Sequence, residues 1–319
     1  MYNVRKIEEN INMRGEFQGL FLFDEPLSPR TTFKVGGCTP LLIEPQDETS
    51  FLIILEELER CAIPFFVLGG GSNLVVPDEG LPCPVISTKR LDRIFLSQDG
   101  RRLVCGAGCS WKQVIDFCIE NKLGGLENFS GLPGSLGGAV FMNARCYDRS
   151  VSDVLLQARY AGPGRAGQAT VETYTMEASH WDYKVSPFQR ELAGSIVLEV
   201  ELSVVPLDDA AAQKMEEKAQ SFVEDRQKKG HFSYPSAGSV FKNNREYGKP
   251  SGKIVDETGL RGLELGGAQV APWHGNFIIN KGNATAADIK GLVDLVQKTV
   301  LGKTGFLLEP EIIFFDKNQ

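Results

Sequence analysis

Two glycine-rich stretches of this sequence have residue types that could bind phosphate. The first is Gly69–Asn73 and the second is Gly131–Gly138. Glycine leaves main-chain N–H groups uncovered and tolerates positive φ angles, and both stretches also contain small polar donors. Such groups on a tight turn form a concave site for phosphate oxygens. Taken alone, the first stretch could be only a turn between strands, but the two together indicate a large phosphate-bearing cofactor.

Two later stretches, Ala237–Asn243 and Leu308–Glu311, carry other chemistry. The former places the hydroxyl of Ser239 and a lysine ammonium beside a glycine turn, and the latter places a carboxylate at the start of an apolar strand. Ser239 does not fit the Gly-x-Ser-x-Gly pattern of acyl-transfer enzymes, because Phe241 occupies the second glycine position. The sequence therefore favours a hydroxyl that is held to donate a proton, with an ordinary turn or helix-cap serine as the alternative.

Other patterns in the chain do not complete a known site. Gly302–Thr304 resembles the end of a P-loop, but Gln297 stands where that motif requires glycine. Gly106–Gly108 resembles the start of a dinucleotide-binding fingerprint, but Trp111 occupies its third glycine position. The three histidines are not spaced as metal ligands, so we expect no metal site.

The composition is ordinary for a globular protein. The chain has 319 residues, of which 42% are hydrophobic and 24% charged, and this length favours two domains. Its net charge of −7 argues against nucleic-acid binding through bulk electrostatics. No apolar run reaches the ~18 residues that span a bilayer, and the N-terminal residues lack a signal-peptide core. The seven cysteines form no Cys-x-x-Cys pair, which suits reduced thiols, so we predict a cytoplasmic protein without membrane or nucleic-acid partners.

Helices and strands are mixed along the chain. Apolar periodicity predicts helices at 47–60, 111–122 and 210–229 and from 285 onward, and strands at 65–68, 102–105, 154–160, 171–176, 196–205 and 311–315. The helix starts carry capping residues, which are Asp47, Ser110 with Gln113, and Thr285 with Asp288. Pro206 marks the best domain boundary. Because a strict βαβ rhythm is missing, the pattern favours an α+β fold over a doubly wound sheet.

Several motifs follow one another in a fixed order between about residues 30 and 312. They are Thr31–Gly37, Gly69–Asn73, Gly131–Gly138, Ser236–Asn243, Gly267–Val270, Asn276–Asn280 and Leu308–Glu311. With these motifs the chain resembles the UDP-N-acetylenolpyruvoylglucosamine reductase (MurB) family. So many motifs in one order make a chance resemblance very improbable.

The resemblance implies a function, a fold and cofactors. The family reduces UDP-N-acetyl-3-O-(1-carboxyvinyl)glucosamine to UDP-N-acetylmuramate, a step of peptidoglycan precursor synthesis. NADPH is the co-substrate, and FAD is bound non-covalently. The implied α+β architecture has an N-terminal helical segment at 1–29, a PCMH-type FAD-binding region of two subdomains at 30–206 and a substrate-binding domain at 207–319.

The resemblance also implies roles for individual residues. The first two glycine stretches would bind FAD, chiefly its pyrophosphate. The implied cofactor residues are Gly69, Gly70, Gly71, Ser72, Asn73, Gly131, Pro133, Gly134, Ser135, Gly137, Gly138 and Asn143. Ser239 matches the serine that protonates the substrate, and Glu311 matches the catalytic glutamate of the family. The implied substrate-binding residues are Tyr183, Lys242, Asn243 and Gln269.

One catalytic position departs from the family. The family has Tyr-Arg-x-Ser-x-Phe where this chain has Tyr183–Phe188, so Lys184 stands in place of the catalytic arginine. Hydride addition to the vinyl group builds negative charge toward the substrate carboxylate, which a cation must offset. Lysine keeps the charge but lacks the planar fork that grips two oxygens. Either Lys184 suffices, or Arg145 or Arg149 takes over its role.

A second departure lies at Gly230–His231, where the family usually has Gln-Pro. The interval before Ser239 is also short for the substrate-capping tyrosine loop of some members, so we expect the subtype without that loop. Tyr183 or Tyr247 could then contact the uridine or the phosphates.

Two alternatives to this function stay open at the level of the sequence. One is another FAD oxidoreductase of the same fold, although many of those attach flavin through histidine and no histidine precedes His180. The other is a flavin-binding protein with impaired catalysis, which the lysine at position 184 keeps open.

Overall fold

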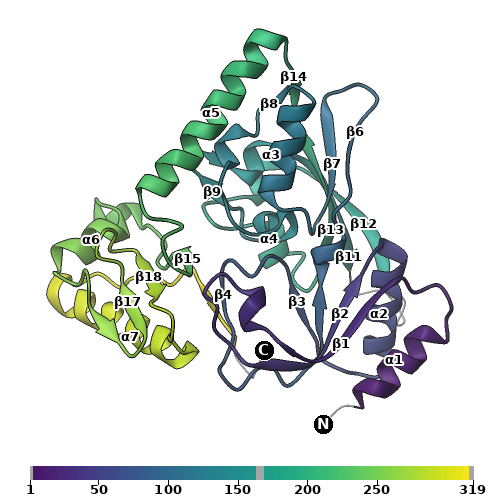
Figure 1. Cartoon of the computed structure of the whole chain (residues 1–319), viewed down its shortest axis with the longest axis horizontal. Coiled ribbons are helices and arrows are strands. Elements are labelled where there is room, and N and C mark those ends of the chain that lie inside the picture. Colours follow the sequence, from purple (N-terminus) through teal and green to yellow (C-terminus); the bar gives the residue numbers. More distant parts are fainter. Residues whose placement is uncertain (1–2, 163–168, 316–319) are drawn as a thin grey trace. The chain divides into compact units, whose positions relative to one another are not determined.

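The computed structural model describes residues 3–162 and 169–315, and Figure 1 shows the course of the chain. The chain forms two compact units. The first unit comprises the described parts of residues 1–23, 40–70 and 83–225, and the second those of 24–39, 71–82 and 226–319. Because each unit collects distant parts of the sequence, each motif has to be located within its own unit.

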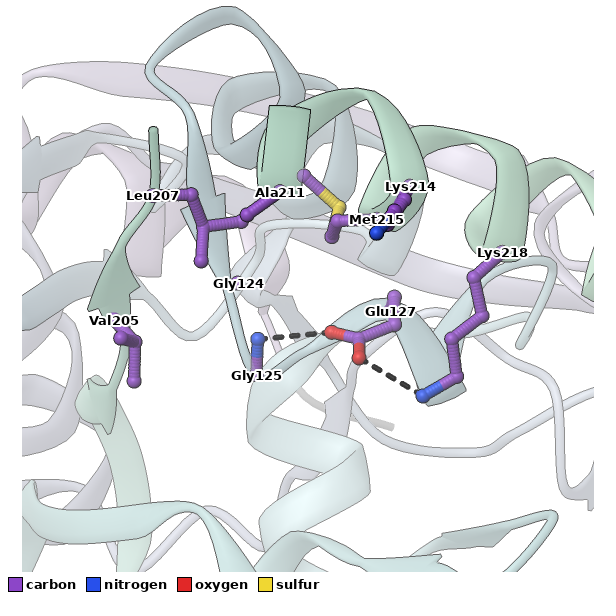
Figure 2. A pocket seen from close by; sticks show the side chains of 9 residues that line it. All are labelled: Gly124, Gly125, Glu127, Val205, Leu207, Ala211, Lys214, Met215 and Lys218. Atoms are coloured by element: carbon purple, nitrogen blue, oxygen red, sulfur yellow. Dashed lines mark hydrogen bonds and ion pairs between the residues drawn. The ribbon is translucent and has the colours of Figure 1, made fainter. Parts of the chain in front are cut away.

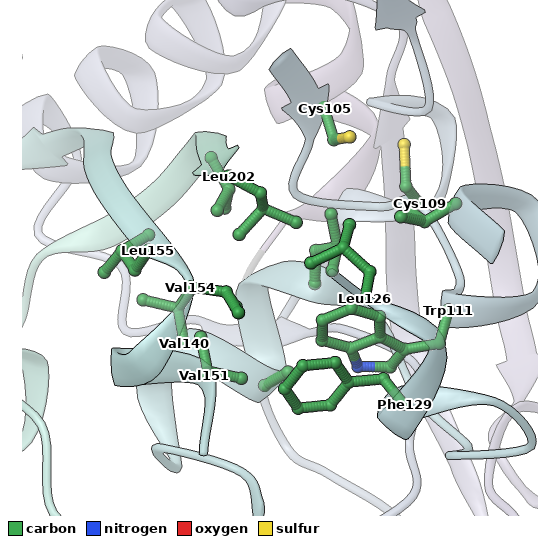
Figure 3. Packing of buried hydrophobic residues seen from close by; sticks show 14 of the residues in the cluster. Cys105, Cys109, Trp111, Leu126, Phe129, Val140, Val151, Val154, Leu155 and Leu202 are labelled. Atoms are coloured by element: carbon green, nitrogen blue, oxygen red, sulfur yellow. The ribbon is translucent and has the colours of Figure 1, made fainter. Parts of the chain in front are cut away.

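An antiparallel five-stranded sheet forms the centre of the first unit. Its strands in spatial order are β12 (Thr170–Thr175), β11 (Leu155–Gly162), β13 (Ile196–Ser203), β7 (Arg102–Gly106) and β6 (Ile94–Leu96). Helices α3 (Trp111–Glu120) and α4 (Leu136–Phe141) share its apolar core. There the rings of Trp111 and Phe129 stack with their centroids 4.2 Å apart (Figure 3). This stacking anchors the chain just before the second glycine stretch.

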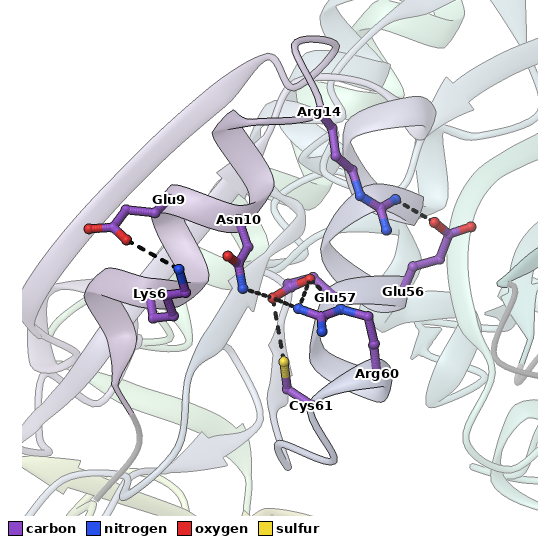
Figure 4. Close-up of polar contacts among 8 residues, drawn as sticks. All are labelled: Lys6, Glu9, Asn10, Arg14, Glu56, Glu57, Arg60 and Cys61. Atoms are coloured by element: carbon purple, nitrogen blue, oxygen red, sulfur yellow. Dashed lines mark hydrogen bonds and ion pairs between the residues drawn. The ribbon is translucent and has the colours of Figure 1, made fainter.

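A second sheet has four strands, in the order β1 (Gly19–Pro26), β2 (Cys38–Pro45), β5 (Val85–Ser87) and β3 (Phe66–Leu68). Strand β5 is parallel to both β2 and β3. Helices α1 (Val4–Asn12) and α2 (Glu48–Arg60) pack on each other, and Asn10 Nδ2 donates to the Glu57 carboxylate at 2.6 Å (Figure 4). Strand β3 leads directly into the first glycine stretch.

The second unit has its own four-stranded antiparallel sheet. Its strands in spatial order are β15 (Ser236–Ser239), β18 (Phe277–Asn280), β17 (Ala268–Val270) and β16 (Glu264–Leu265). Helices α6 (Ser251–Glu257) and α7 (Ala286–Thr304) share an apolar core with this sheet. A separate parallel pair joins β4 (Leu74–Val75) to β19 (Ile313–Phe314).

Shorter elements connect these sheets. Two-residue strands pair β8 (Leu123–Gly124) with β14 (Val205–Pro206) and β9 (Arg145–Cys146) with β10 (Arg149–Ser150). The long helix α5 (Asp209–Lys228) contains the boundary between the two units, because the first unit ends at Asp225 and the second continues from Arg226. Short 3-10 helices lie at Ser28–Arg30, Thr88–Arg90, Glu127–Phe129, Val151–Asp153, Ala178–His180, Pro187–Gln189 and Arg245–Tyr247. Of the helices in the described residues, none has both the length and the apolar character needed to cross a lipid bilayer.

The helix starts follow the capping residues predicted from the sequence. Asp47 caps α2 through its side chain. The capping boxes of Ser110 with Gln113 and of Thr285 with Asp288 begin α3 and α7. These predictions were correct because a cap is formed by residues within one turn of each other.

Several local predictions were wrong in extent, among them the strand predicted at 196–205, which ends at Ser203. Helix α3 ends at Glu120 instead of 122, and Lys122 takes a positive φ of 53°. Strand β19 covers only two residues of the predicted strand, because the N–H of Glu311 bonds Val240 instead. The second glycine stretch is not entirely loop, since its last residues begin α4 with Ser135 as the N-cap.

Candidate active site

The first two glycine stretches meet within the first unit. The N–H of Gly70 donates to Ser135 Oγ at 3.1 Å. A Cβ atom on Gly70 would lie 2.5 Å from Gly134 Cα, and one on Gly69 would lie 2.5 Å from Ser135 Oγ. Gly70 must therefore be glycine for the two stretches to approach each other, whereas a side chain at Gly69 would displace the Ser135 hydroxyl.

The surface around Ser135 fits a phosphate group. A Cβ on Gly138 would meet only Ser135 Oγ, at 3.4 Å, so packing leaves room at this glycine. Gly131 and Gly134 take positive φ angles of 74° and 102°, on either side of the fixed φ of Pro133. The result is a bare main-chain surface with one hydroxyl at its centre, which is the donor set that a pyrophosphate requires.

The rest of the first stretch belongs to the second unit. Gly71 takes a φ of 61°, and a Cβ there would lie 2.1 Å from the carbonyl oxygen of Arg30. The N–H of Thr32 donates to the Gly71 carbonyl at 3.0 Å. The side chain of Asn73 donates to the main-chain carbonyl of Glu311 at 2.9 Å. The amide of Asn73 is thus used inside the protein, and flavin contacts of Gly71, Ser72 and Asn73 stay predictions.

Asn143 uses both polar atoms of its buried side chain within the protein. Its Nδ2 donates to the carbonyl of Asp182 at 2.8 Å, and its Oδ1 accepts from the N–H of Ser152 at 3.1 Å. Asn143 itself has a positive φ of 40°. It therefore ties the end of α4 to the turn that follows Asp182, whether or not it also contacts flavin.

That turn carries Lys184. Asp182 and Val185 exchange main-chain hydrogen bonds of 3.2 and 3.1 Å, which leaves Tyr183 and Lys184 at the tip. Lys184 has a left-handed φ of 60°, and its side chain is half-buried, whereas Tyr183 is exposed. The two alternative cations, Arg145 and Arg149, are exposed on the β9–β10 hairpin of the same unit.

Ser239 is presented by a bulge in the second unit. Strand β15 pairs Ser236 with Ile279 and Ser239 with Phe277, so three residue steps on β15 oppose two on β18. Gly238 lies within the bulge with a φ of 72°. A bulge inserts a residue and re-aims the side chains after it, which gives Ser239 its half-buried position at the end of the strand.

The segments of Ser239 and Glu311 lie side by side. The N–H of Glu311 donates to the Val240 carbonyl at 2.7 Å, and the N–H of Lys242 donates to the Glu309 carbonyl at 2.9 Å. These bonds flank an isolated antiparallel bridge between Phe241 and Pro310. The structure therefore brings together the hydroxyl and carboxylate segments that are separated by about 70 residues of sequence.

The predicted substrate residues of the second unit contact other protein groups. Lys242 Nζ forms an ion pair with Glu309 at 2.6 Å, and Asn243 Oδ1 accepts from the N–H of Ser251 at 2.9 Å. Gln269 lies on β17 and donates to Glu264 at 2.7 Å. The hydroxyl of Tyr247 donates to the Leu307 carbonyl at 2.9 Å. Substrate contacts of these side chains stay predictions.

A cavity of about 290 Å³ opens in the first unit beside the start of α5 (Figure 2). It is lined by Gly124, Gly125, Glu127, Val205, Leu207, Ala211, Lys214, Met215 and Lys218. The Glu127 carboxylate accepts from the N–H of Gly125 at 2.8 Å and from Lys218 at 3.0 Å. The predicted flavin and substrate residues are not among those that line it.

Sequence reasoning gave no role to Asn276. This side chain is only 4% exposed and makes two hydrogen bonds to the main chain of Phe241. The sequence does contain a signal for it, because Asn276 and Asn280 flank the apolar run Phe277–Ile279. Amides beside a buried strand are normally hydrogen-bonded, so such residues are expected to bond a neighbouring segment.

Two family profiles match the chain. Residues 39–163 match an FAD binding domain, and residues 229–315 match the C-terminal domain of UDP-N-acetylenolpyruvoylglucosamine reductase. Together with the α+β fold, these matches make the chain an FAD-dependent oxidoreductase with a PCMH-type FAD-binding region.

Individual relatives cover nearly the whole chain. The UDP-N-acetylenolpyruvoylglucosamine reductase of Treponema denticola is 46% identical over 304 residues, which is 93% of this chain and 94% of that protein. That of Treponema pallidum is 40% identical over 328 residues, which is 91% of this chain and 92% of that protein. The crystal structure of the same reductase (MurB) from Thermus caldophilus is 30% identical, with a TM-score of 0.74, and covers 94% of this chain and 100% of its own.

The chain belongs to the UDP-N-acetylenolpyruvoylglucosamine reductase family. The family and the FAD cofactor that the sequence motifs indicated are thereby confirmed.

Proposed function

We infer that the chain reduces UDP-N-acetyl-3-O-(1-carboxyvinyl)glucosamine to UDP-N-acetylmuramate, with NADPH as co-substrate, in peptidoglycan precursor synthesis. One structural observation carries this function beyond family membership. The hydroxyl segment of Ser239 and the carboxylate segment of Glu311 are joined by main-chain hydrogen bonds, with 2.7 Å between Glu311 N and Val240 O. This pairing brings the two main-chain segments next to each other, as a protonation step that uses groups from both segments requires.

The chemistry divides between the cofactor and the chain. When bound, FAD supplies the hydride chemistry between NADPH and the outer vinyl carbon of the substrate. We propose that Ser239 gives a proton to the adjacent carbon and that Glu311 acts beside it. Lys184 offsets the charge that builds toward the carboxylate, because a cation at such a position stabilises developing negative charge. The bulge at Gly238 supports the role of Ser239, since it directs that side chain away from the regular strand.

The cofactor residues form a second part of the proposal. We assign the pyrophosphate to the surface around Ser135, where Gly69 and Gly138 lack side chains. The support is the space beside Gly138 and the hydroxyl that already accepts from Gly70. Gly71, Ser72 and Asn73 would contribute main-chain groups.

The proposal extends to domains and location. We propose that residues 30–206 bind FAD and that 207–319 bind the nucleotide sugar, and the two matched profiles at 39–163 and 229–315 fall within these ranges. We expect the protein to act in the cytoplasm on a UDP-sugar, without a nucleic-acid partner, as its negative net charge favours.

The test is a product assay with purified flavoprotein. NADPH oxidation is followed with and without the UDP-enolpyruvyl sugar under anaerobic conditions, so that oxygen does not consume reduced flavin. We expect oxidation to depend on the sugar and UDP-N-acetylmuramate to be found by mass spectrometry. Sugar-independent oxidation without that product would contradict the proposed function.

A further inference from the structure

The side chain of Asn276 takes the place of a strand neighbour for the segment that follows Ser239. The pairing of β15 with β18 ends at Ser239 opposite Phe277, and the N–H of Val240 then donates to the Asn276 carbonyl at 2.9 Å. At the next residue the side chain takes over. The N–H of Phe241 donates to Asn276 Oδ1 at 2.8 Å, and Asn276 Nδ2 donates to the Phe241 carbonyl at 2.8 Å. One amide thus makes both bonds that a neighbouring strand would make.

The other edge of the same segment bonds the Glu311 stretch. Val240 accepts from the N–H of Glu311, and Lys242 donates to Glu309. Phe241 and Pro310 face each other between these two hydrogen bonds without bonding each other. The main-chain N–H and carbonyl of Phe241 therefore point to the opposite edge, where Asn276 lies. The segment is therefore held on one edge by Asn276 and on the other by the stretch that ends in Glu311.

Because both residues are buried, loss of these hydrogen bonds would be costly. The side chain of Asn276 is 4% exposed and that of Phe241 is 1% exposed. A buried N–H or carbonyl group without a partner is strongly unfavourable, so Phe241 would shift if the amide were lost. Phe241 lies two residues after Ser239 and pairs with the residue before Glu311. A shift there would displace the proton donor and the carboxylate together.

We propose that Asn276 is a positioning residue for the protonation step, because its side-chain amide fixes Phe241 and thereby the placement of Ser239 and Glu311. The proposal rests on the proposed function and adds to it a residue that has no contact with the substrate in that mechanism. A displacement of about 1 Å at a reacting group can cost up to ~10²-fold in rate, which sets the size of the expected effect.

The experiment uses the whole flavoprotein and separates the two half-reactions by stopped flow. Wild-type protein is first shown to be reduced by NADPH and reoxidised by the UDP-enolpyruvyl sugar, so failure of the proposed function is seen before any variant is made. In Asn276→Ala we expect flavin reduction within about twofold of wild type and reoxidation slowed by at least ~10-fold. Equal slowing of both half-reactions, or none, would overturn the proposal.

Asn276→Asp gives a sharper readout. A protonated aspartic acid has one donor and one acceptor, as the amide does, whereas the ionised form has no donor for the Phe241 carbonyl. Relative to wild type at each pH, the reoxidation rate of Asn276→Asp should therefore recover as the pH is lowered, and that of Asn276→Ala should not. The titratable and charged groups nearby are His274, whose Nδ1 accepts from the N–H of Asn276, the Asp256–Arg261 pair, and, on the segments that flank Phe241, the Lys242–Glu309 ion pair and Glu311. They are present in wild type and in both variants, so a recovery that occurs only in Asn276→Asp comes from the introduced carboxyl group or from its coupling to these groups. Parallel pH profiles of the two variants would overturn the proposal.

Asn280 provides a matched control on the same strand. It is 3% exposed, and its side chain donates to the Phe33 carbonyl at 2.9 Å and accepts from the N–H of Gly282 at 2.7 Å. We expect Asn280→Ala to lower the melting temperature about as much as Asn276→Ala without changing the ratio of the two half-reaction rates. A ratio that changes equally in both variants would show a general loss of packing and contradict the proposal.

If Asn276→Ala does not retain flavin, Asn276→Gln decides the question. Glutamine keeps a donor and an acceptor but moves them by one methylene, so flavin binding should persist. We expect selective slowing of reoxidation in this variant as well. Reoxidation at the wild-type rate would overturn the role of Asn276.

Discussion

The side-chain amide of Asn73 donates to the main-chain carbonyl of Glu311 at 2.9 Å, across 238 residues of sequence. The contact is reciprocal along the chain, because the N–H of Ile313 donates to the Asn73 carbonyl at 2.9 Å. The parallel pairing of β4 with β19 begins with Leu74 opposite Ile313. The end of the first glycine stretch and the Glu311 stretch are therefore one structural feature of the second unit, and a change at Asn73 should affect Glu311 as well.

The first prediction concerns proton donation by Ser239. Ser239→Ala removes the hydroxyl and should leave flavin reduction by NADPH nearly intact, while reoxidation by the UDP-enolpyruvyl sugar slows by at least ~10²-fold, the low end for a lost general acid. Stopped-flow absorbance of the flavin measures both steps. Ser236→Ala, on the same strand, is the control and should stay close to wild type. Unimpaired reoxidation in Ser239→Ala would assign the proton to another donor.

The second prediction concerns the bulge that presents Ser239. Gly238 has a φ of 72°, and a Cβ there would meet no atom within 4 Å, so Gly238→Ala introduces backbone strain without a clash. We expect a loss of about 1–2 kcal/mol in the free energy of unfolding, together with slower reoxidation by the sugar.

Gly248 is a matched control, since its φ is 68° and a Cβ there would also meet nothing within 4 Å. Gly248→Ala should lose similar stability in denaturant unfolding and keep its reoxidation rate. Equal reoxidation rates in Gly238→Ala and Gly248→Ala would show that the bulge has no role in catalysis.

The third prediction concerns the flavin linkage. The glycine surface around Ser135 would hold FAD by hydrogen bonds alone, so acid or heat precipitation should leave the yellow colour in the supernatant. Absorption spectra of supernatant and pellet measure this. Colour that stays with the pellet would contradict non-covalent binding.

The sequence predicted the features that are formed by neighbouring residues. The caps of α2, α3 and α7 lie within one turn, and the glycine stretches are recognisable from their composition. Their contact at Ser135 was not predicted, since Gly70 and Ser135 are 65 residues apart.

The partners of the side-chain amides could not be predicted in this way. Asn143 is a predicted flavin residue, but its partners within the protein, Asp182 and Ser152, were not foreseen. The partner of Asn276, Phe241, lies 35 residues earlier and two residues beyond the end of β15. Such contacts depend on the register of two strands and on a bulge at Gly238, and neither leaves a periodic pattern in the sequence.

The fourth prediction concerns acid stability through Glu57 (Figure 4). Burial of this carboxyl group opposes its ionisation, but hydrogen bonds from Arg60, Asn10 and the Cys61 thiol outweigh burial and lower the pKa of Glu57. A lowered pKa in the folded state gives stability that is complete above the unfolded pKa of about 4.3 and is lost as the pH falls through the folded value.

Glu57→Gln should therefore lose about 1–3 kcal/mol at pH 7 and show a weaker fall in stability below about pH 4.3 than wild type. Denaturant unfolding at a series of pH values measures this. Glu56→Gln, which breaks the Arg14 pair on the neighbouring surface, is the control and should cost no more than about 1 kcal/mol. An unchanged pH slope in Glu57→Gln would contradict the assignment.

The fifth prediction concerns Lys184, which occupies the arginine position of the family motif. Lys184→Met keeps the side-chain length and the left-handed φ of 60° while removing the charge, so the comparison isolates the ammonium group. We expect a cost on the order of 2–4 kcal/mol in the sugar half-reaction, the range for one lost oxyanion-type donor. Lys184→Arg should retain or improve activity, because a guanidinium fork grips two oxygens.

The competing arrangement gives the opposite pattern. If the role has passed to the β9–β10 hairpin, Lys184→Met is nearly silent, and Arg145→Met or Arg149→Met is severe. Both arginines are exposed, and Arg145 donates to Ser150 Oγ at 3.4 Å in its hairpin, so their removal should leave the fold intact. Each of the four variants, Lys184→Met, Lys184→Arg, Arg145→Met and Arg149→Met, removes or replaces one cation. Their reoxidation rates therefore show whether Lys184 or a hairpin arginine offsets the charge. A wild-type rate in Lys184→Met would end the assignment of the charge-offsetting role to Lys184.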